Sequence, residues 1–455
     1  MNRMATVNRL PSEVLAKILG FRQDDRDLIA ATHACERWRS TLLSTPLLWT
    51  KVVFGDPDRT FTYLERSKGA PLHVSIGELA LHYPAGDMSW VGRADSLYVN
   101  VDVEQMGSIA EQLCLPAPLL RSLTFDGQSR LPVFGSSSRS VHIPLGFLGQ
   151  QVPLLRNLTF LSVSPSPVSN LPLHNLTSLE WVDRNSLVVT EELLALLTSA
   201  PLLEVITLIF FTPGAMLPRF VTLSKLRKFV WINKRGLFSL MPLLITPELE
   251  DLEIHTAYDI THSNPSVILP PHRDHVPLLV EPTALRYVCQ DYTRSWNFTY
   301  TSGHLTIRET PQLFPRDPPT DRWLSPNTPI SFEGIKVLVV EGLGGYPLPE
   351  NIPIEEFKSL ESLKLVGEVD RLLDIIRPNG DATTEFLSAP SLSLLELHWT
   401  FHEWDFPFET LVEILRERKE GGHRVKTVRV TGEYRQCSNE EALELSRLVD
   451  VLMLD

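Results

Sequence analysis

The sequence predicts a mixed α/β chain, in which a small N-terminal module of three short helices is followed by an irregular solenoid with one strand in each repeat. The first observation is a set of short amphipathic segments in residues 8–50. The second is a leucine-containing phrase that returns along much of the remaining chain. The third is the composition, since 43% hydrophobic and 21% charged residues are typical of a folded chain.

Residues 8–50 contain three apolar patterns with helical spacing. Pro11 suits the first turn of a helix, and one face of that helix would carry Val14, Leu15, Ile18 and Leu19. Acidic residues at 24, 25 and 27 precede an apolar run at 28–31 and favour a second helix, and a third follows. A proline then ends the third helix, so the bulky residues at 47–49 can fold back over the module.

The order of these residues resembles an F-box of the fungal type. The resemblance rests on Leu10-Pro11-Ser12-Glu13 at the start, Asp27-Leu28 in the second helix, Cys35 and Trp38-Arg39 in the third, and Pro46-Leu47-Leu48-Trp49 at the end. It covers residues 8–50 only. Ala34 departs from the family, which usually has a larger aliphatic residue there, and Thr32 and His33 make the same face less apolar.

The resemblance implies a partner and a set of docking residues. An F-box docks on the Skp adaptor of a cullin-based ubiquitin ligase through its opening Leu-Pro and the apolar faces of its helices. Carried over to this chain, the adaptor-binding residues are Leu10, Pro11, Val14, Ile18, Leu28, Cys35 and Trp38. For Trp38 and Trp49 an internal packing role is an equal alternative, because large aromatic side chains are often buried.

A leucine phrase recurs after residue 115. It reads Pro118-Leu119-Leu120-Arg121-Ser122-Leu123 and then Pro153-Leu154-Leu155-Arg156-Asn157-Leu158, with later variants near 179, 203, 226, 249, 360 and 392. The leucines at 155, 179, 203, 226 and 249 are 23 or 24 residues apart, within the range of leucine-rich repeats. The asparagine or cysteine that usually follows the third leucine is generally absent, so the predicted repeats are degenerate.

Residues 255–330 interrupt the repeat spacing with a high density of prolines. We expect an irregular insertion, with a strand pair possible around residues 287–288 and 305–307. The insertion contains the aromatic residues Tyr287, Tyr292, Trp296, Phe298 and Tyr300. They could bind a partner protein, or they could pack the insertion against the repeats.

The predicted domain organisation has six parts. They are the F-box at 8–50, a connecting segment with the first irregular repeats at 51–115, leucine-rich-repeat-like turns at 116–254, the insertion at 255–330, further repeats at 331–432, and a capping helix at 433–455.

Charge and cysteine content exclude several classes of protein. The net charge is −13 with no dense basic run, which disfavours nucleic-acid binding. No apolar run approaches the roughly 18 residues of a membrane span, so we expect an intracellular protein, cytoplasmic or nuclear. Cys35, Cys114, Cys289 and Cys437 are far apart and form no CxxC pair, which argues against disulfides and clustered zinc.

The sequence carries no recognisable catalytic or cofactor motif. The glycines at 342, 344 and 345 follow an apolar run, but the third position of a dinucleotide fingerprint, 347, is a proline. His272 and His275 are too few for a metal site. We therefore expect no enzyme activity, no cofactor and no metal.

The resulting hypothesis is a substrate receptor of an F-box ubiquitin ligase, which binds the adaptor through the F-box and a target protein through the repeats. One alternative is an F-box scaffold that delivers no substrate, and another is a hydrolase with its site in residues 255–330. Some basic residues in the repeat phrases could meet an acidic or phosphorylated partner, or could be solvated strand faces; they are Arg121, Arg156, Arg227 and Lys228.

Overall fold

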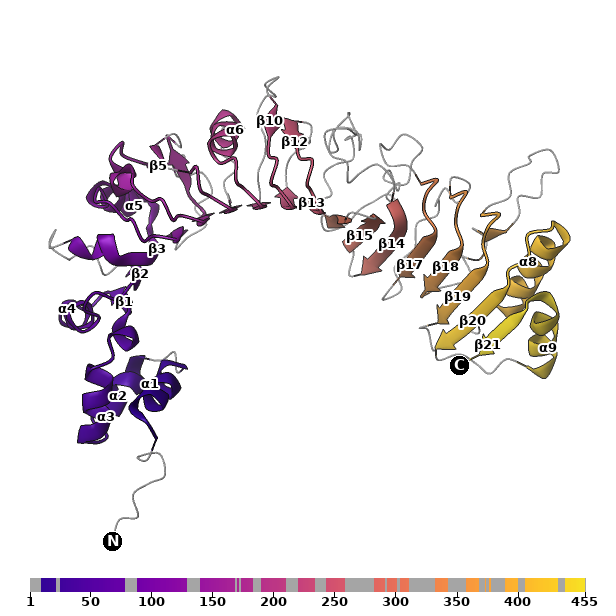
Figure 1. The fold of residues 1–455 in the computed structure, drawn as a ribbon. Helices are drawn as coiled ribbons and strands as arrows, with labels where there is room; N and C mark the ends of the chain where they lie inside the picture. The colour runs from indigo at the N-terminus through magenta and orange to yellow at the C-terminus, as the bar shows by residue number, and fades with distance from the viewer. Residues whose placement is uncertain are drawn as a thin grey trace, which may run out of the picture. The chain divides into compact units, whose positions relative to one another are not determined.

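The structure is a computed structural model, and it divides the chain into two compact units, Met1–Leu203 and Glu204–Asp455, which are described separately (Figure 1). The described residues are 10–21, 25–77, 88–128, 140–167, 170–171, 173–182, 190–209, 220–233, 243–257, 282–290, 293–300, 303–310, 332–342, 357–367, 373, 376–377, 389–399, 406–432 and 438–454.

The first unit begins with the three predicted helices. They are α1 (Ser12–Phe21), α2 (Asp25–Thr32) and α3 (Glu36–Leu43), followed by the 3-10 turn η2 (Pro46–Trp49). Pro46 occupies the first turn of η2, where a missing N–H has no cost, and Trp49 at its end is fully buried. The expectation that residues 47–49 fold back over the helices is confirmed, because η2 packs on both α1 and α3.

Six parallel strands follow in the first unit, and each pairs with the next in chain order. They are β1 (Lys51–Phe54), β2 (Leu72–Gly77), β3 (Ala94–Asp102), β4 (Ser122–Gln128), β6 (Asn157–Leu161) and β8 (Ser178–Val182). The connections contain α4 (Pro57–Arg66), η4 (Ser89–Arg93), α5 (Val103–Gln112), η5 (Phe147–Gln150), α6 (Thr190–Ser199) and the short parallel pair β5 (Ser140–His142) and β7 (Ser164–Ser166). Helix α4 packs on β1, and α5 packs on β3 and β4 (Figure 1).

The second unit contains a longer sheet. In order of pairing its strands are β9 (Val205–Ile209), β11 (Lys228–Asn233), β13 (Asp251–Ala257), β16 (Gly303–Thr310), β15 (Thr293–Tyr300), β14 (Pro282–Gln290), β17 (Val337–Gly342), β18 (Ser362–Val366), β19 (Leu394–Trp399), β20 (Thr427–Gly432) and β21 (Val451–Leu454). Only β15 is antiparallel to its neighbours among these strands. The unit also has the pair β10 (Val221–Thr222) and β12 (Leu244–Ile245), and the helices α8 (Phe408–Glu420) and α9 (Asn439–Leu448).

Two segments differ from the sequence-based expectations. The strand pair expected near 287–288 and 305–307 is a three-stranded meander, in which β14 and β16 both pair with β15 and not with each other. The meander joins the sheet between β13 and β17 instead of leaving it. The predicted capping helix at 433–455 is shorter, because α9 ends at Leu448 and a further parallel strand, β21, follows it.

The leucine phrase forms a tight turn followed by a strand. In successive repeats the N–H of a buried leucine or isoleucine donates to the carbonyl three residues earlier, as seen for Leu155, Leu176, Leu203, Leu226, Leu249, Ile335, Leu360 and Leu392. The carbonyl just before a strand then accepts the N–H groups of two consecutive residues in the next repeat. These carbonyls belong to Arg121, Arg156, Glu204, Arg227, Lys336, Glu361, Ser393 and Lys426. This backbone ladder provides hydrogen bonds between repeats although the asparagine expected in such repeats is generally absent.

Alternation along each strand separates a buried side from an open side. In β6, Leu158 and Phe160 are buried, whereas Asn157 and Thr159 are not. The buried side chains of neighbouring strands stack on each other, since Phe160 lies between Phe125 and Trp181 with ring centroids 5.9 and 5.4 Å away. Each fully buried large apolar side chain stabilises the fold by roughly 1.5–3 kcal/mol. We call the opposite, less buried side of the strands the open face.

Candidate functional site

The helical module buries one side of each helix and exposes large apolar residues on others. Leu15 and Leu42 are almost completely buried in its small core, and the indole N–H of Trp49 donates to the carbonyl of Leu42 at 2.9 Å. The exposed fractions are 40% for Val14, 44% for Ile18, 39% for Ile29 and 70% for Leu47. Val14 and Ile18 are four residues apart on one face of α1.

We call Val14, Ile18, Ile29 and Leu47 the exposed apolar set of the module. Val14 and Ile18 adjoin each other on α1, and adjoining exposed apolar residues are the kind of surface that another protein commonly covers. Ile29 and Leu47 were not predicted as binding residues. The sequence did mark the segment that contains Leu47, Pro46-Leu47-Leu48-Trp49, as part of the F-box resemblance. The exposure of the Leu47 side chain, however, depends on the geometry of η2.

The seven predicted adaptor-binding residues differ in accessibility. Pro11, Val14, Ile18 and Cys35 are exposed, and Leu10 and Trp38 are half-buried. The carbonyl of Leu10 accepts a hydrogen bond from the guanidinium of Arg37. Leu28 is only 8% exposed and lies in the core. Direct contact of these residues with an adaptor stays a prediction, and it fits Leu28 least.

The module is joined to the first repeat by an aromatic contact. Trp49 meets Tyr63 of α4 edge-to-face, with ring centroids 5.1 Å apart. The guanidinium of Arg66, also on α4, lies 4.5 Å from the centre of the Trp49 ring. Aromatic pairs and cation–π contacts of this kind each contribute about 0.5–1.5 kcal/mol beyond burial. The internal packing role is therefore confirmed for Trp49, and it holds the module against the start of the sheet.

The open face of the first unit is rich in hydroxyl and amide groups. The Tyr98 hydroxyl donates to Asp126 at 2.7 Å and accepts a hydrogen bond from the Asn100 side chain at 2.9 Å. Partial burial, together with the bond to Asp126, raises the pKa of Tyr98 above its usual value. Nearby, Nδ1 of His73 is 2.8 Å from the Ser96 hydroxyl. The hydroxyl and amide groups described here largely satisfy one another or the Asp126 carboxylate.

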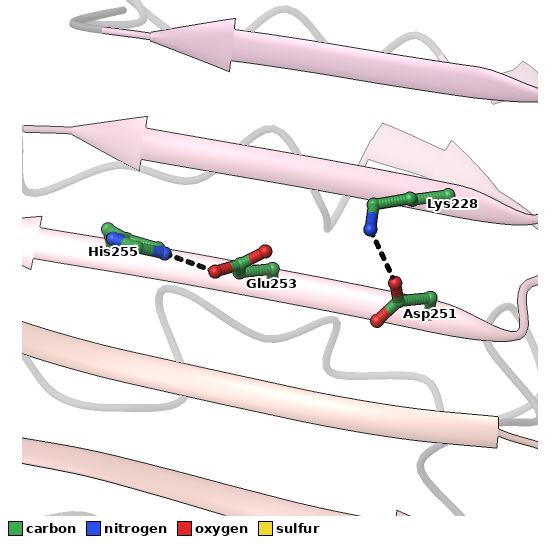
Figure 2. A network of polar contacts seen from close by, with 4 residues as sticks. All are labelled: Lys228, Asp251, Glu253 and His255. Atoms are coloured by element: carbon green, nitrogen blue, oxygen red, sulfur yellow. Dashed lines mark hydrogen bonds and ion pairs between the residues drawn. The ribbon is translucent and has the colours of Figure 1, made fainter.

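The open face of β11 and β13 carries a charged network (Figure 2). Lys228 reaches across to Asp251 on the neighbouring strand at 2.8 Å, and Nε2 of His255 is 2.6 Å from a carboxylate oxygen of Glu253. The hydrogen bond from Lys228 to Asp251 raises the pKa of the lysine. Two carboxylates therefore accompany one lysine in this part of the face.

Three of the basic residues in the repeat phrases have partners within the chain. Arg121 lies 3.4 Å from Asp95, Lys228 pairs with Asp251, and Arg156 donates to the carbonyl of Asn175 at 2.7 Å. These contacts favour the solvated-strand interpretation over a site for an acidic or phosphorylated partner at these residues.

Most of the catalytic and metal candidates from the sequence lie outside the described residues. His272, His275 and the glycines at 344 and 345 lie outside the described residues, as do the side chains of the aromatic cluster between 287 and 300. In the described ranges, no three His, Cys, Asp or Glu side chains gather in a way that could hold a metal ion. No helix in the same ranges has the length and apolarity needed to cross a membrane.

Comparisons with known proteins identify one part of the chain. The family model described as F-box-like matches residues 7–55, which contain the helical module and β1. No curated protein matches the chain. The crystal structure of a TLR13–ssRNA13 complex aligns over 89% of this chain and 54% of its own, with 13% sequence identity and a TM-score of 0.26. The chain thus spans about half the length of that structure, and the TM-score is too low to carry an argument.

Proposed function

We propose that this chain, whose residues 7–55 form an F-box-like domain, is a substrate-binding subunit of an F-box/cullin-type ubiquitin ligase. F-box domains typically bind a Skp adaptor, which connects them to a cullin scaffold. The carrying observation is the exposed apolar set, Val14, Ile18, Ile29 and Leu47, within that domain. Exposed apolar residues of this kind are typical of a surface that another protein covers.

The repeats supply the second half of the proposal. Parallel strands with one open face present many side chains on one continuous surface in each unit, as repeat proteins do when they bind other proteins. We propose that these strands form a degenerate leucine-rich-repeat solenoid and that the open face holds a target protein. The role is then non-catalytic and intracellular, because the chain contributes proximity between the target and a conjugating enzyme.

The attachment of the module to the repeats supports this mechanism. Trp49, Tyr63 and Arg66 hold the helices against α4, so an adaptor bound to the module would be fixed in orientation relative to the first strands. A target that is held in a defined orientation presents its lysines at a high effective concentration.

The test is co-purification of the full chain with a Skp adaptor. The variant Ile18→Asp/Leu47→Asp places two charges in the exposed apolar set without touching the buried core, and we expect it to lose the adaptor. The matched control is Leu145→Asp, because Leu145 is 77% exposed and lies outside the module. Retention of the adaptor by the double variant, or its equal loss in the control, contradicts the proposal.

A second measurement separates the substrate receptor from an F-box scaffold. Proteins that accumulate in cells carrying the Ile18→Asp/Leu47→Asp variant, and that bind the wild-type chain, are expected to be targets. Binding of the adaptor without any change in protein turnover would favour the scaffold alternative.

A further inference from the structure

Among the described residues, the open face of the neighbouring strands β14, β17, β18, β19 and β20 carries more cations than carboxylates. Its charged residues are Arg286, Glu341, Lys364, Glu396 and Arg429, and we call them the cationic face. They lie on neighbouring parallel strands, since Arg286 is paired in register with Val339, Val339 with Lys364, Lys364 with Glu396, and Glu396 with Arg429. Three cations thus accompany two carboxylates.

The two carboxylates each lie close to one arginine. Arg286 donates to Glu341 at 2.8 Å, and Arg429 lies 3.9 Å from Glu396, at the outer limit of an ion pair. Lys364, between them, forms no ion pair with any residue that the structure describes. The chain as a whole has a net charge of −13, and on β11 and β13 carboxylates outnumber lysine (Figure 2). The cationic face is therefore a local exception.

Apolar residues accompany these charges on the same side of the strands. Two residues before Val339 on the open face of β17 is Val337, which is 39% exposed, and the equivalent position of β19 is Leu394, which is half-buried. The same position is Ser362 in β18, between these two strands, and Thr427 in β20, next to β19. An apolar and hydroxyl row thus runs beside the row that contains Lys364 and Arg429.

We infer that this part of the open face binds an acidic segment of the target protein in which carboxylates and aliphatic side chains lie side by side. The inference rests on the proposed function, since it names the class of target. Partner carboxylates would pair with Lys364 and add to the contacts that Arg429 already makes, and partner aliphatic groups would cover Val337 and Leu394. Nucleic acid is a poorer occupant, because its phosphates follow one another without interruption, whereas a mixed peptide segment can place aliphatic side chains opposite Glu341 and Glu396.

The experiment measures binding of a fluorescein-labelled peptide in which glutamate alternates with leucine, by fluorescence anisotropy with the full chain and no adaptor. We expect the wild type to bind this peptide and to bind much more weakly a matched peptide with glutamine in place of glutamate. The variant Lys364→Glu/Arg429→Glu is expected to lose roughly tenfold in affinity. The wild-type affinity should fall as salt rises from about 0.05 M to about 0.3 M, because the attraction is screened.

The matched control is Lys51→Glu, which reverses an exposed cation on the open face of the other unit, in β1. We expect unchanged binding. Lys364→Gln/Arg429→Gln gives a milder test, and its thermal unfolding should match that of the wild type. The inference is overturned if the wild type does not bind, if both Lys364/Arg429 variants bind as tightly as the wild type, or if Lys51→Glu loses as much affinity as they do. Tighter binding of polyuridylate through Lys364 and Arg429 would assign the face to nucleic acid and also overturn it.

The result is independent of adaptor binding. A chain that binds the adaptor but not the acidic peptide retains the proposed function and loses the inference about its target. A chain that binds the peptide through Lys364 and Arg429 but not the adaptor retains an acidic-peptide site and loses the proposed function as a ligase subunit.

Discussion

The burial of apolar side chains differs between the helical module and the strands. In α1, Leu15 is buried but Val14 and Ile18 are exposed. In β6, Leu158 and Phe160 are both buried and the residues between them are polar. In β6 these apolar residues pack within the chain, whereas Val14, Ile18, Ile29 and Leu47 of the module stay exposed. Stability is therefore concentrated in the repeats, and the surface of the module suits association.

The largest effect is expected at the junction of the two regions. Trp49→Ala removes a fully buried indole, its hydrogen bond to the Leu42 carbonyl and its contact with Tyr63, and should lower the free energy of unfolding by about 3–5 kcal/mol. Urea denaturation followed by circular dichroism measures it. Trp49→Phe keeps the ring contact and should lose much less. A similar loss in Trp38→Ala, where the side chain is only half-buried, would show that burial does not set the size of the loss.

The strands should be sensitive to backbone spacing as well as to packing. Gly432 ends β20 with φ of 113°, a region that favours glycine, and a β-carbon there would overlap the carbonyl of Trp399. Gly432→Ala should cost about 2–4 kcal/mol, from the left-handed backbone and the displaced strand. Thermal unfolding measures the loss. The control is Gly69→Ala, where a β-carbon has open space; a comparable loss there would contradict this explanation.

Helix α1 contains both a buried and an exposed large apolar side chain. Leu15→Ala removes a buried side chain and should cost about 2–3 kcal/mol. Ile18→Ala, three residues further on, should change the free energy of unfolding by less than about 0.5 kcal/mol, because the side chain is exposed. Adaptor binding should show the reverse order of sensitivity once folding is accounted for. Equal stability losses would show that the exposed apolar set belongs to the core.

The smallest effect is expected for ion pairs between repeats. Lys225 lies 2.9 Å from Glu248, and both side chains are about half exposed. Lys225→Ala should cost less than about 1 kcal/mol, and the difference from wild type should shrink in about 1 M salt. A larger, salt-independent loss in chemical denaturation would mean that the lysine stem contributes packing.

Local patterns predicted part of the elements. Helical spacing at 14–19 identified α1, and the leucine phrase identified strands such as β4, β6 and β18, because both patterns are read within a few residues. The helices α4 and α5, in the predicted connecting segment, were not predicted. The order of β14, β15 and β16 was not predictable from the same signals, since pairing between β13 and β16 joins residues about fifty positions apart. The short strand β21 was missed because Val451–Leu454 has too few residues to distinguish a strand from the end of a helix.

The candidate surfaces were predicted less completely. The resemblance to an F-box pointed to Pro11, Val14 and Ile18, which are exposed, but included Leu28, which is buried. The exposure of Ile29 and Leu47 depends on how α2 and η2 pack. The cationic face could not be found from the sequence, because Lys364, Glu396 and Arg429 become neighbours only through strand register.

The backbone ladder between repeats has a consequence for how such a protein can change. Each repeat is attached to the next through a main-chain carbonyl, such as that of Arg156, which receives two N–H groups whatever side chains they carry. These hydrogen bonds between repeats therefore do not depend on which side chains point outward. Individual repeats could be exchanged, or their outward residues rewritten, without redesigning the joints between them, which makes the chain a suitable scaffold for engineering new recognition surfaces.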